Sequence, residues 1–195
     1  MAHRLAPHAH AVFWRGALAI TFAVAVFAWP LFGPTVLVLI FGVFAMIDGA
    51  MAFSMAMREA PRTRWSIALM LEGVTGVVIG AFGSLLPAVA GGWLVGLIAA
   101  WALLTGALEI LAASAIGSDR ATTVALLAGG AASILLGGTV IAWPALGTSA
   151  LAQLLGGYAV AFGAVLVALS IRLRRSARPR GHAQRPVSLA RGGTP

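Results

Sequence analysis

The chain has 195 residues, of which 61% are hydrophobic and only 9% are charged, and its formal net charge is +8. Soluble domains carry about 25% charged residues, so this balance argues against a soluble protein and indicates a membrane protein. Every basic residue among Lys and Arg is arginine, and the arginines gather in the leader, in one polar link and in the tail. That distribution favours cationic flanks of membrane helices over nucleic-acid binding. The absence of cysteine excludes disulfides and thiol chemistry.

Six apolar segments follow one another after a polar leader at residues 1–11. Each is close to the roughly 20 residues that a helical membrane crossing needs. Helices are expected at residues 12–29, 35–57, 65–86, 93–116, 121–143 and 148–171. The predicted fold class is therefore an all-α integral membrane protein with a membrane domain at residues 12–172. The basic tail, residues 173–195, is rich in Arg, Pro, Gly and Ser and is expected to be disordered, because it lacks apolar content.

An internal repeat with a period of 57 residues runs through this domain without insertion or deletion. Its equivalent positions include Pro30, Pro87 and Pro144, then Phe44, Trp101 and Tyr158, and two glycine sets, Gly16, Gly73 and Gly130, and Gly49, Gly106 and Gly163. Each unit is one helical hairpin, so successive repeats, at about 12–64, 65–120 and 121–172, have the same orientation and are parallel. Cleavage of the first segment as a signal peptide would remove one repeat member, so we expect it to be retained.

Glycines at fixed repeat positions predict close helix packing. Small residues let backbones approach where lipid gives no hydrophobic drive. We therefore expect the two repeat-locked glycine sets to lie at helix contacts and the first set to lie between hairpins, with a hinge or pore-lining role as the alternative. The GxxxG spacing also occurs at Gly76 and Gly80 and at Gly92 and Gly96. Tryptophans at predicted helix ends, Trp29, Trp65 and Trp143, are interpreted as headgroup anchors.

The placement of arginine predicts the orientation. The leader, the polar links and the tail carry nearly all of the arginines, whereas the three proline turns carry no charge. Because cytoplasmic loops of membrane proteins are enriched in arginine, both termini are expected in the cytoplasm and the proline turns outside. The predicted surroundings are a bilayer, with a homo-oligomer or other membrane proteins left open as partners.

Four charged residues fall inside predicted helices: Arg15, Asp48, Glu72 and Glu109. Each costs about 2.5–3.5 kcal/mol to insert, so each is a functional candidate. Arg15 and Glu72 hold the same repeat position, and all four are expected at similar depth in the inner leaflet. An ion-paired cluster that fixes helix register, a proton-responsive or transport site, and separate side chains that reach toward the headgroups are the three interpretations. Our hypothesis is that Arg15 contacts at least one carboxylate and that at least one carboxyl is proton-sensitive.

Enzymatic chemistry is not expected. The four histidines lie in the leader and tail, so none can serve a nucleophile or a metal within the membrane domain. No nucleotide-binding fingerprint is present. We therefore expect no catalytic residues, no cofactor and no metal.

An ordered series of short sequences carries a family resemblance over residues 13–172. The series comprises Arg15-Gly16, Trp29-Pro30, Asp48-Gly49, Glu72-Gly73, the stretch from Trp101 to Glu109, Trp143-Pro144 and the stretch from Tyr158 to Gly163. In this series the chain resembles the HdeD-type acid-resistance membrane proteins, which are built from a short hairpin repeat of unknown function. Leu86 stands where the other two repeats have Trp.

The resemblance implies a bacterial inner-membrane protein linked to acid survival or another stress, and it supplies no mechanism. Our first expectation is a non-enzymatic stress-resistance protein that responds to protons through buried carboxylates. The alternatives are a small-solute or ion transporter or channel, and a structural or partner-binding membrane protein.

Overall fold

The chain folds into a bundle of long helices. The computed structural model describes residues 9–28, 34–58, 63–90, 93–115, 120–143 and 147–177. The helices are α2 (Ala9–Ala28), α3 (Pro34–Ala56), α4 (Arg64–Leu85), α5 (Pro87–Ala90), α6 (Leu94–Ala115), α7 (Arg120–Ala142) and α8 (Thr148–Ala177). All but the four-residue α5 are long and apolar enough to cross a membrane. Helices satisfy their own backbone hydrogen bonds, as lipid requires, and the expected six-span, all-α fold is confirmed.

The start of α4 and its end have local causes. Thr63 caps the helix, since its Oγ1 accepts a hydrogen bond from the backbone N–H of Ser66 at 3.1 Å. The helix ends beside Leu86, directly before Pro87, because a residue that precedes proline is disfavoured in helical conformation. Pro87 then occupies the first position of α5, where its missing N–H costs nothing. A short helix thus takes the place of the turn expected here.

The last helix is longer than expected. We placed residues 173–177 in a disordered tail, and this was wrong, because α8 continues to Ala177. Leu173 is buried, and the guanidinium of Arg174 lies 5.1 Å from the centre of the Phe13 ring on α2. Apolar burial and a cation–π contact therefore extend the helix past the point where the composition becomes basic.

The first helix is also longer at its start. The leader was expected to reach residue 11, but α2 begins at Ala9, which is buried against α8. The remaining parts of the expected leader and tail, residues 1–8 and 178–195, lie outside the described residues.

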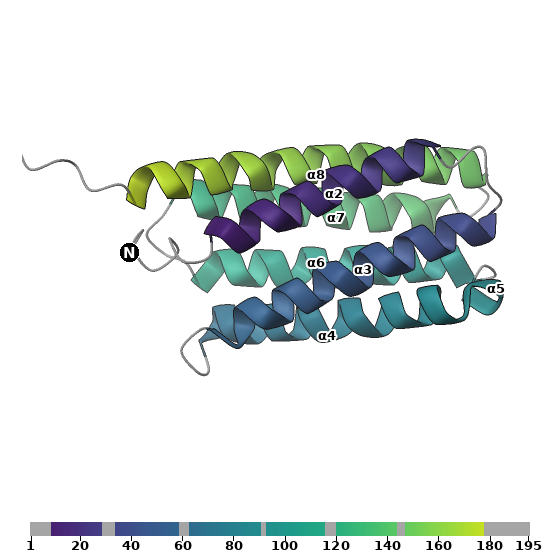
Figure 1. Ribbon diagram of the computed structural model, residues 1–195, viewed down its shortest axis with the longest axis horizontal. Coiled ribbons are helices and arrows are strands. Elements are labelled where there is room, and N and C mark those ends of the chain that lie inside the picture. The colour runs from purple at the N-terminus through teal and green to yellow at the C-terminus, as the bar shows by residue number, and fades with distance from the viewer. Residues whose placement is uncertain are drawn as a thin grey trace, which may run out of the picture.

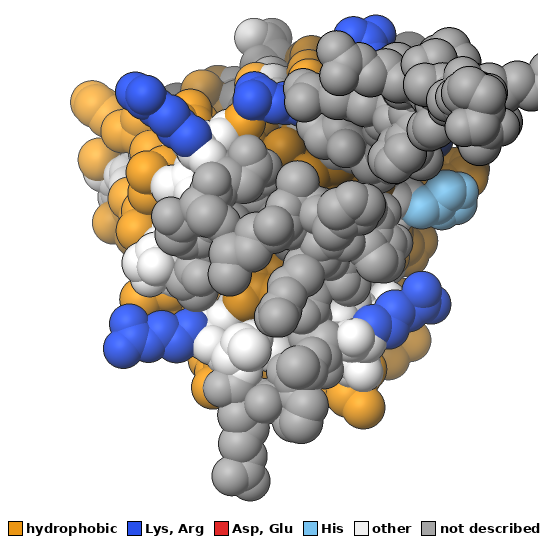
Figure 2. Space-filling model, turned by 90° about the vertical axis from the view of Figure 1, so that its left-hand side faces the viewer, with side chains coloured by type: hydrophobic (Ala, Val, Ile, Leu, Met, Phe, Trp, Pro, Cys, Tyr) orange, Lys and Arg blue, Asp and Glu red, His pale blue; other side chains and the backbone are white. Residues whose placement is uncertain are grey.

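Both ends of the described chain lie at the same end of the bundle (Figure 1). The beginning of α2 and the end of α8 meet there, and α5 lies at the opposite end. Arginine side chains surround the face that carries the termini (Figure 2). The turn residues Pro30 and Pro144 lie outside the described residues.

The helices pack most closely between successive hairpins. α3 packs against α4, α6 against α7, and α8 against α2, each far more extensively than the two long helices of any one hairpin pack on each other. The contact of α8 with α2 closes the series, so the three repeats surround a common axis.

Glycines permit these close contacts. A Cβ atom built on Gly16 would lie 2.9 Å from the carbonyl oxygen of Gly163. The equivalent distances are 2.8 Å from Gly73 to Gly49 and 2.7 Å from Gly130 to Gly106. The structure thus places all six repeat-locked glycines at the contacts between hairpins, where the neighbouring backbone leaves no room for a side chain.

The GxxxG pairs differ from one another. Gly76 packs against the backbone of α3, with 2.8 Å from a built Cβ to the Cα of Gly49, and Gly80 also faces α3. Gly96 has no atom within 4 Å of a built Cβ, and Gly92 lies outside the described residues. The spacing alone therefore did not identify which glycines lie at a helix contact.

Candidate functional site

Three helices meet at a buried ion triad. Arg15 on α2 donates from Nε to Oδ1 of Asp48 and from Nη2 to Oδ2, both at 2.8 Å. Nη2 also donates to Glu72 on α4. The three residues are 7%, 3% and 5% exposed. The paired bonds to Asp48 use the planar fork of the guanidinium, which fits a carboxylate.

Glu109 lies near this triad without joining it. Its side chain on α6 is 6% exposed, and its Oε2 has no hydrogen-bond partner within the part of the chain that the structure describes. The charges of Glu72, Arg15 and Asp48 act on it electrostatically. Arg15 therefore pairs with two of the three expected carboxylates, and the third, Glu109, forms no ion pair with any described residue.

Gly129 makes room for this carboxyl group. It holds the same repeat position as Arg15 and Glu72, and a Cβ built on it would lie 2.9 Å from Oε2 of Glu109. In the third repeat, the carboxyl group of Glu109 from α6 thus occupies the space that a side chain at position 129 would need.

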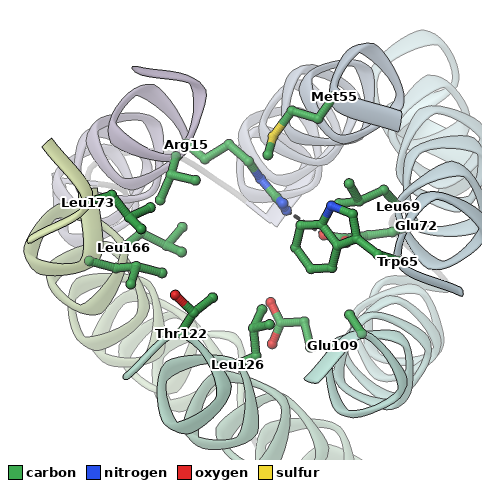
Figure 3. A pocket seen from close by; sticks show the side chains of 13 residues that line it. Arg15, Met55, Trp65, Leu69, Glu72, Glu109, Thr122, Leu126, Leu166 and Leu173 are labelled. Carbon is green, nitrogen blue, oxygen red and sulfur yellow. Dashed lines mark hydrogen bonds and ion pairs between the residues drawn. The ribbon is translucent and has the colours of Figure 1, made fainter. Parts of the chain in front are cut away.

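The charged groups border a cavity of about 50 Å³. Arg15, Glu72 and Glu109 reach toward it from three different helices (Figure 3). Much of the remaining lining consists of repeat-equivalent residues, Val12, Leu69 and Leu126 in one set and Met55, Ala112 and Leu169 in another. The cavity therefore lies on the common axis of the repeats. One water needs roughly 10–15 Å³, so the cavity can hold water beside Glu109.

The axis is closed on the other side of the charged groups. Phe44, Trp101 and Tyr158 follow first, with ring centres 5.7 Å apart between Phe44 and Trp101 and 6.3 Å between Trp101 and Tyr158. Two further sets of repeat-equivalent buried residues follow toward the proline turns: Phe41, Ile98 and Leu155, and Leu37, Leu94 and Leu151. The site is therefore polar only toward the end of the bundle that carries the termini.

The structure corrects the sequence-based interpretation of Trp65 as a headgroup anchor. Its ring lies over the middle of the cavity (Figure 3), and its Nε1 is buried without a hydrogen-bond partner among the described residues. The indole therefore separates the site from the arginine-bearing end. Trp143 is 63% exposed, as an anchor would be, and Trp29 lies outside the described residues.

The arrangement suits proton binding better than metal or cofactor binding. Among the described residues no group of three His, Cys, Asp or Glu is placed to hold a metal ion. The cavity is too small for an organic cofactor, since ligand pockets measure about 300–1,000 Å³. A proton, a small cation or water can interact with Glu109.

Sequence reasoning missed Gly129 and Tyr158 as parts of the site. Tyr158 shares a 2.6 Å hydrogen bond with Ser133 beside Glu109. The signal for Gly129 was present in the repeat, because the third member of the position that holds Arg15 and Glu72 is a glycine. The sequence interpretation took this glycine only as a position without charge.

The comparison with protein families agrees with the repeat. The protein family DUF308, described as a short repeat of unknown function, matches the chain three times, at residues 14–82, 71–141 and 128–184. The chain belongs to this family. Successive matches begin 57 residues apart, which is the period found within the chain. Searches of curated proteins and of solved structures found no matching protein.

Proposed function

We propose that this DUF308 protein is a non-enzymatic, multi-pass protein of the bacterial inner membrane that takes part in acid or general stress resistance by binding a cytoplasmic proton at Glu109. The observation that carries the proposal is the buried Oε2 of Glu109, which has no partner in the described structure and faces a cavity on the repeat axis. An isolated carboxylate is costly in apolar surroundings, whereas the neutral acid costs far less.

The surroundings of Glu109 support reversible proton exchange. The guanidinium of Arg15 is already engaged by Asp48 and Glu72. The indole of Trp65 lies between the cavity and the arginine-bearing end, which the positive-inside rule assigns to the cytoplasm. A proton from the cytoplasm would therefore have to pass this ring to reach water beside Glu109. The resemblance to HdeD-type acid-resistance proteins supports acid stress as the physiological setting.

The apolar layers beyond the site support proton binding rather than passage. An ion or solute that crossed along the axis would have to open the layers of Phe41 and Leu37, which are completely buried. The cavity does leave an ion transporter as a second candidate, because it lies on the axis of the repeats. Flux through liposomes that contain the purified protein tests that candidate.

The test is acid survival of a deletion strain that expresses Glu109→Gln at the wild-type level. Glutamine keeps the shape and cannot exchange a proton, so survival should fall to that of the deletion strain. The control Asp119→Asn removes a carboxyl group from a polar link and should leave survival unchanged. Wild-type survival with Glu109→Gln would refute the proposal.

Stability and spectroscopy test the same proton directly. Proton uptake removes an unpaired buried charge, so acidification should stabilise the wild type relative to Glu109→Gln over the range in which the proton binds. The carboxyl infrared band should change with pH in the wild type and lose that component in the variant. A component that persists in the variant would assign the proton to another group.

A further inference from the structure

A surface groove of about 530 Å³ lies between α7 and α8. Its walls are formed by small and branched apolar residues, and two arginines border it. The lining residues are Arg120, Ala121, Val124, Ala125, Ala128, Val165, Ala168, Leu169 and Arg172. Arg120 begins α7, and Arg172 lies near the end of α8, so both belong to the arginine-bearing end of the bundle.

The depth of the groove distinguishes the third repeat from the second. Ala128 and Ala168 are equivalent to Leu71 and Leu111 in the second repeat. Those leucines are 51% and 58% exposed, so they point outward and cover the corresponding surface. In the third repeat, two alanines in place of these leucines leave the groove between α7 and α8 open at the depth of the lipid chains.

The charge of the groove also distinguishes the third repeat from the second. The second-repeat equivalents of Arg120 and Arg172 are Thr63 and Ala115, which are neutral. Both arginines are exposed, and neither forms an ion pair within the described residues. The neighbouring Arg174 instead lies over the Phe13 ring of α2. The third repeat therefore combines an apolar groove with two exposed guanidinium groups.

We propose that this groove binds one anionic phospholipid of the leaflet at the arginine-bearing end. The phosphate binds Arg120 and Arg172, because guanidinium groups form paired hydrogen bonds with phosphate oxygens. One acyl chain lies along Val124, Ala128 and Val165. Basic pockets between membrane helices on the cytoplasmic side bind anionic headgroups in this manner. The proposal is independent of proton binding at Glu109.

Binding to the purified full-length protein tests the proposal by native mass spectrometry in detergent, with short-chain phosphatidylglycerol and phosphatidylcholine as probes. The wild type should bind phosphatidylglycerol preferentially. The double variant Arg120→Gln, Arg172→Gln should lose on the order of tenfold in affinity for phosphatidylglycerol. Arg58→Gln, Arg64→Gln removes the same charge elsewhere at this end and should bind as the wild type does.

The groove itself is tested without changing any charge. The double variant Ala128→Leu, Ala168→Leu introduces the side chains of the second repeat and should weaken phosphatidylglycerol binding. Because both positions are exposed, its thermal unfolding temperature should equal that of the wild type. Equal binding of the two lipids by the wild type would overturn the proposal. So would equal losses in the two arginine pairs, which would indicate general surface attraction, or full binding in the filled groove.

Discussion

Arg15 holds three helices together through one guanidinium group. It bonds to Asp48 on α3 and to Glu72 on α4, and all three side chains are buried. Removing both charges of a buried pair is often tolerated, whereas removing one partner strands the other. The triad is thus sensitive to unbalanced substitutions, and its contribution to stability can be separated from its contribution to packing.

Arg15→Ala should lower the free energy of unfolding by about 3–5 kcal/mol, because it leaves two buried carboxylates without a cation. The triple variant Arg15→Ala, Asp48→Asn, Glu72→Gln removes all three charges and should recover most of that loss. Unfolding in mixed micelles with increasing dodecyl sulfate measures both. Equal destabilisation of the single and triple variants would show that lost packing, and not stranded charge, is responsible.

The sequence identified the four charged residues but not their pairing. Intramembrane charges are rare, so Arg15, Asp48, Glu72 and Glu109 were found without a structure. Their similar depth predicted a single cluster. Which carboxylate remains without a cation depends on side-chain reach and on the room beside Gly129, and neither is visible in a periodic pattern.

At the scale of the helices, the boundaries were predictable and the pairing was not. Pro, Gly and polar links delimit α3, α4, α6 and α7 to within one residue of the expected ends. These helices are apolar on every side, so no amphipathic face indicates which neighbour each one touches. The repeat-locked glycines supplied that information only once they were placed opposite one another.

Gly73→Ala should destabilise the fold by about 1–3 kcal/mol, because the added methyl group would meet the backbone of α3. The control Gly138→Ala, on α7, places its methyl group in open space and should stabilise the protein by about 0.5–1 kcal/mol through helix propensity. The same micelle unfolding assay compares them. Equal effects at the two positions would contradict the close packing of α3 and α4.

The whole molecule combines three hairpins of one orientation into a closed ring. The helix ends that flank the polar links therefore lie at one end, and the helix ends that flank the proline turns lie at the other. This arrangement predicts the topology: arginines surround the end with the termini (Figure 2), and that end should face the cytoplasm because positive charge resists translocation.

Reporter fusions after Pro34, Gly92 and Gly147 should therefore read outside, and a fusion after Arg178 should read inside. The three outside sites are repeat equivalents or near neighbours of them, so they must agree with one another if the hairpins are parallel. An inside reading at only one of these sites would contradict the parallel arrangement of the hairpins. Inversion of all four readings would keep the fold and place the arginine-bearing end outside. Glu109 would then exchange its proton with the exterior.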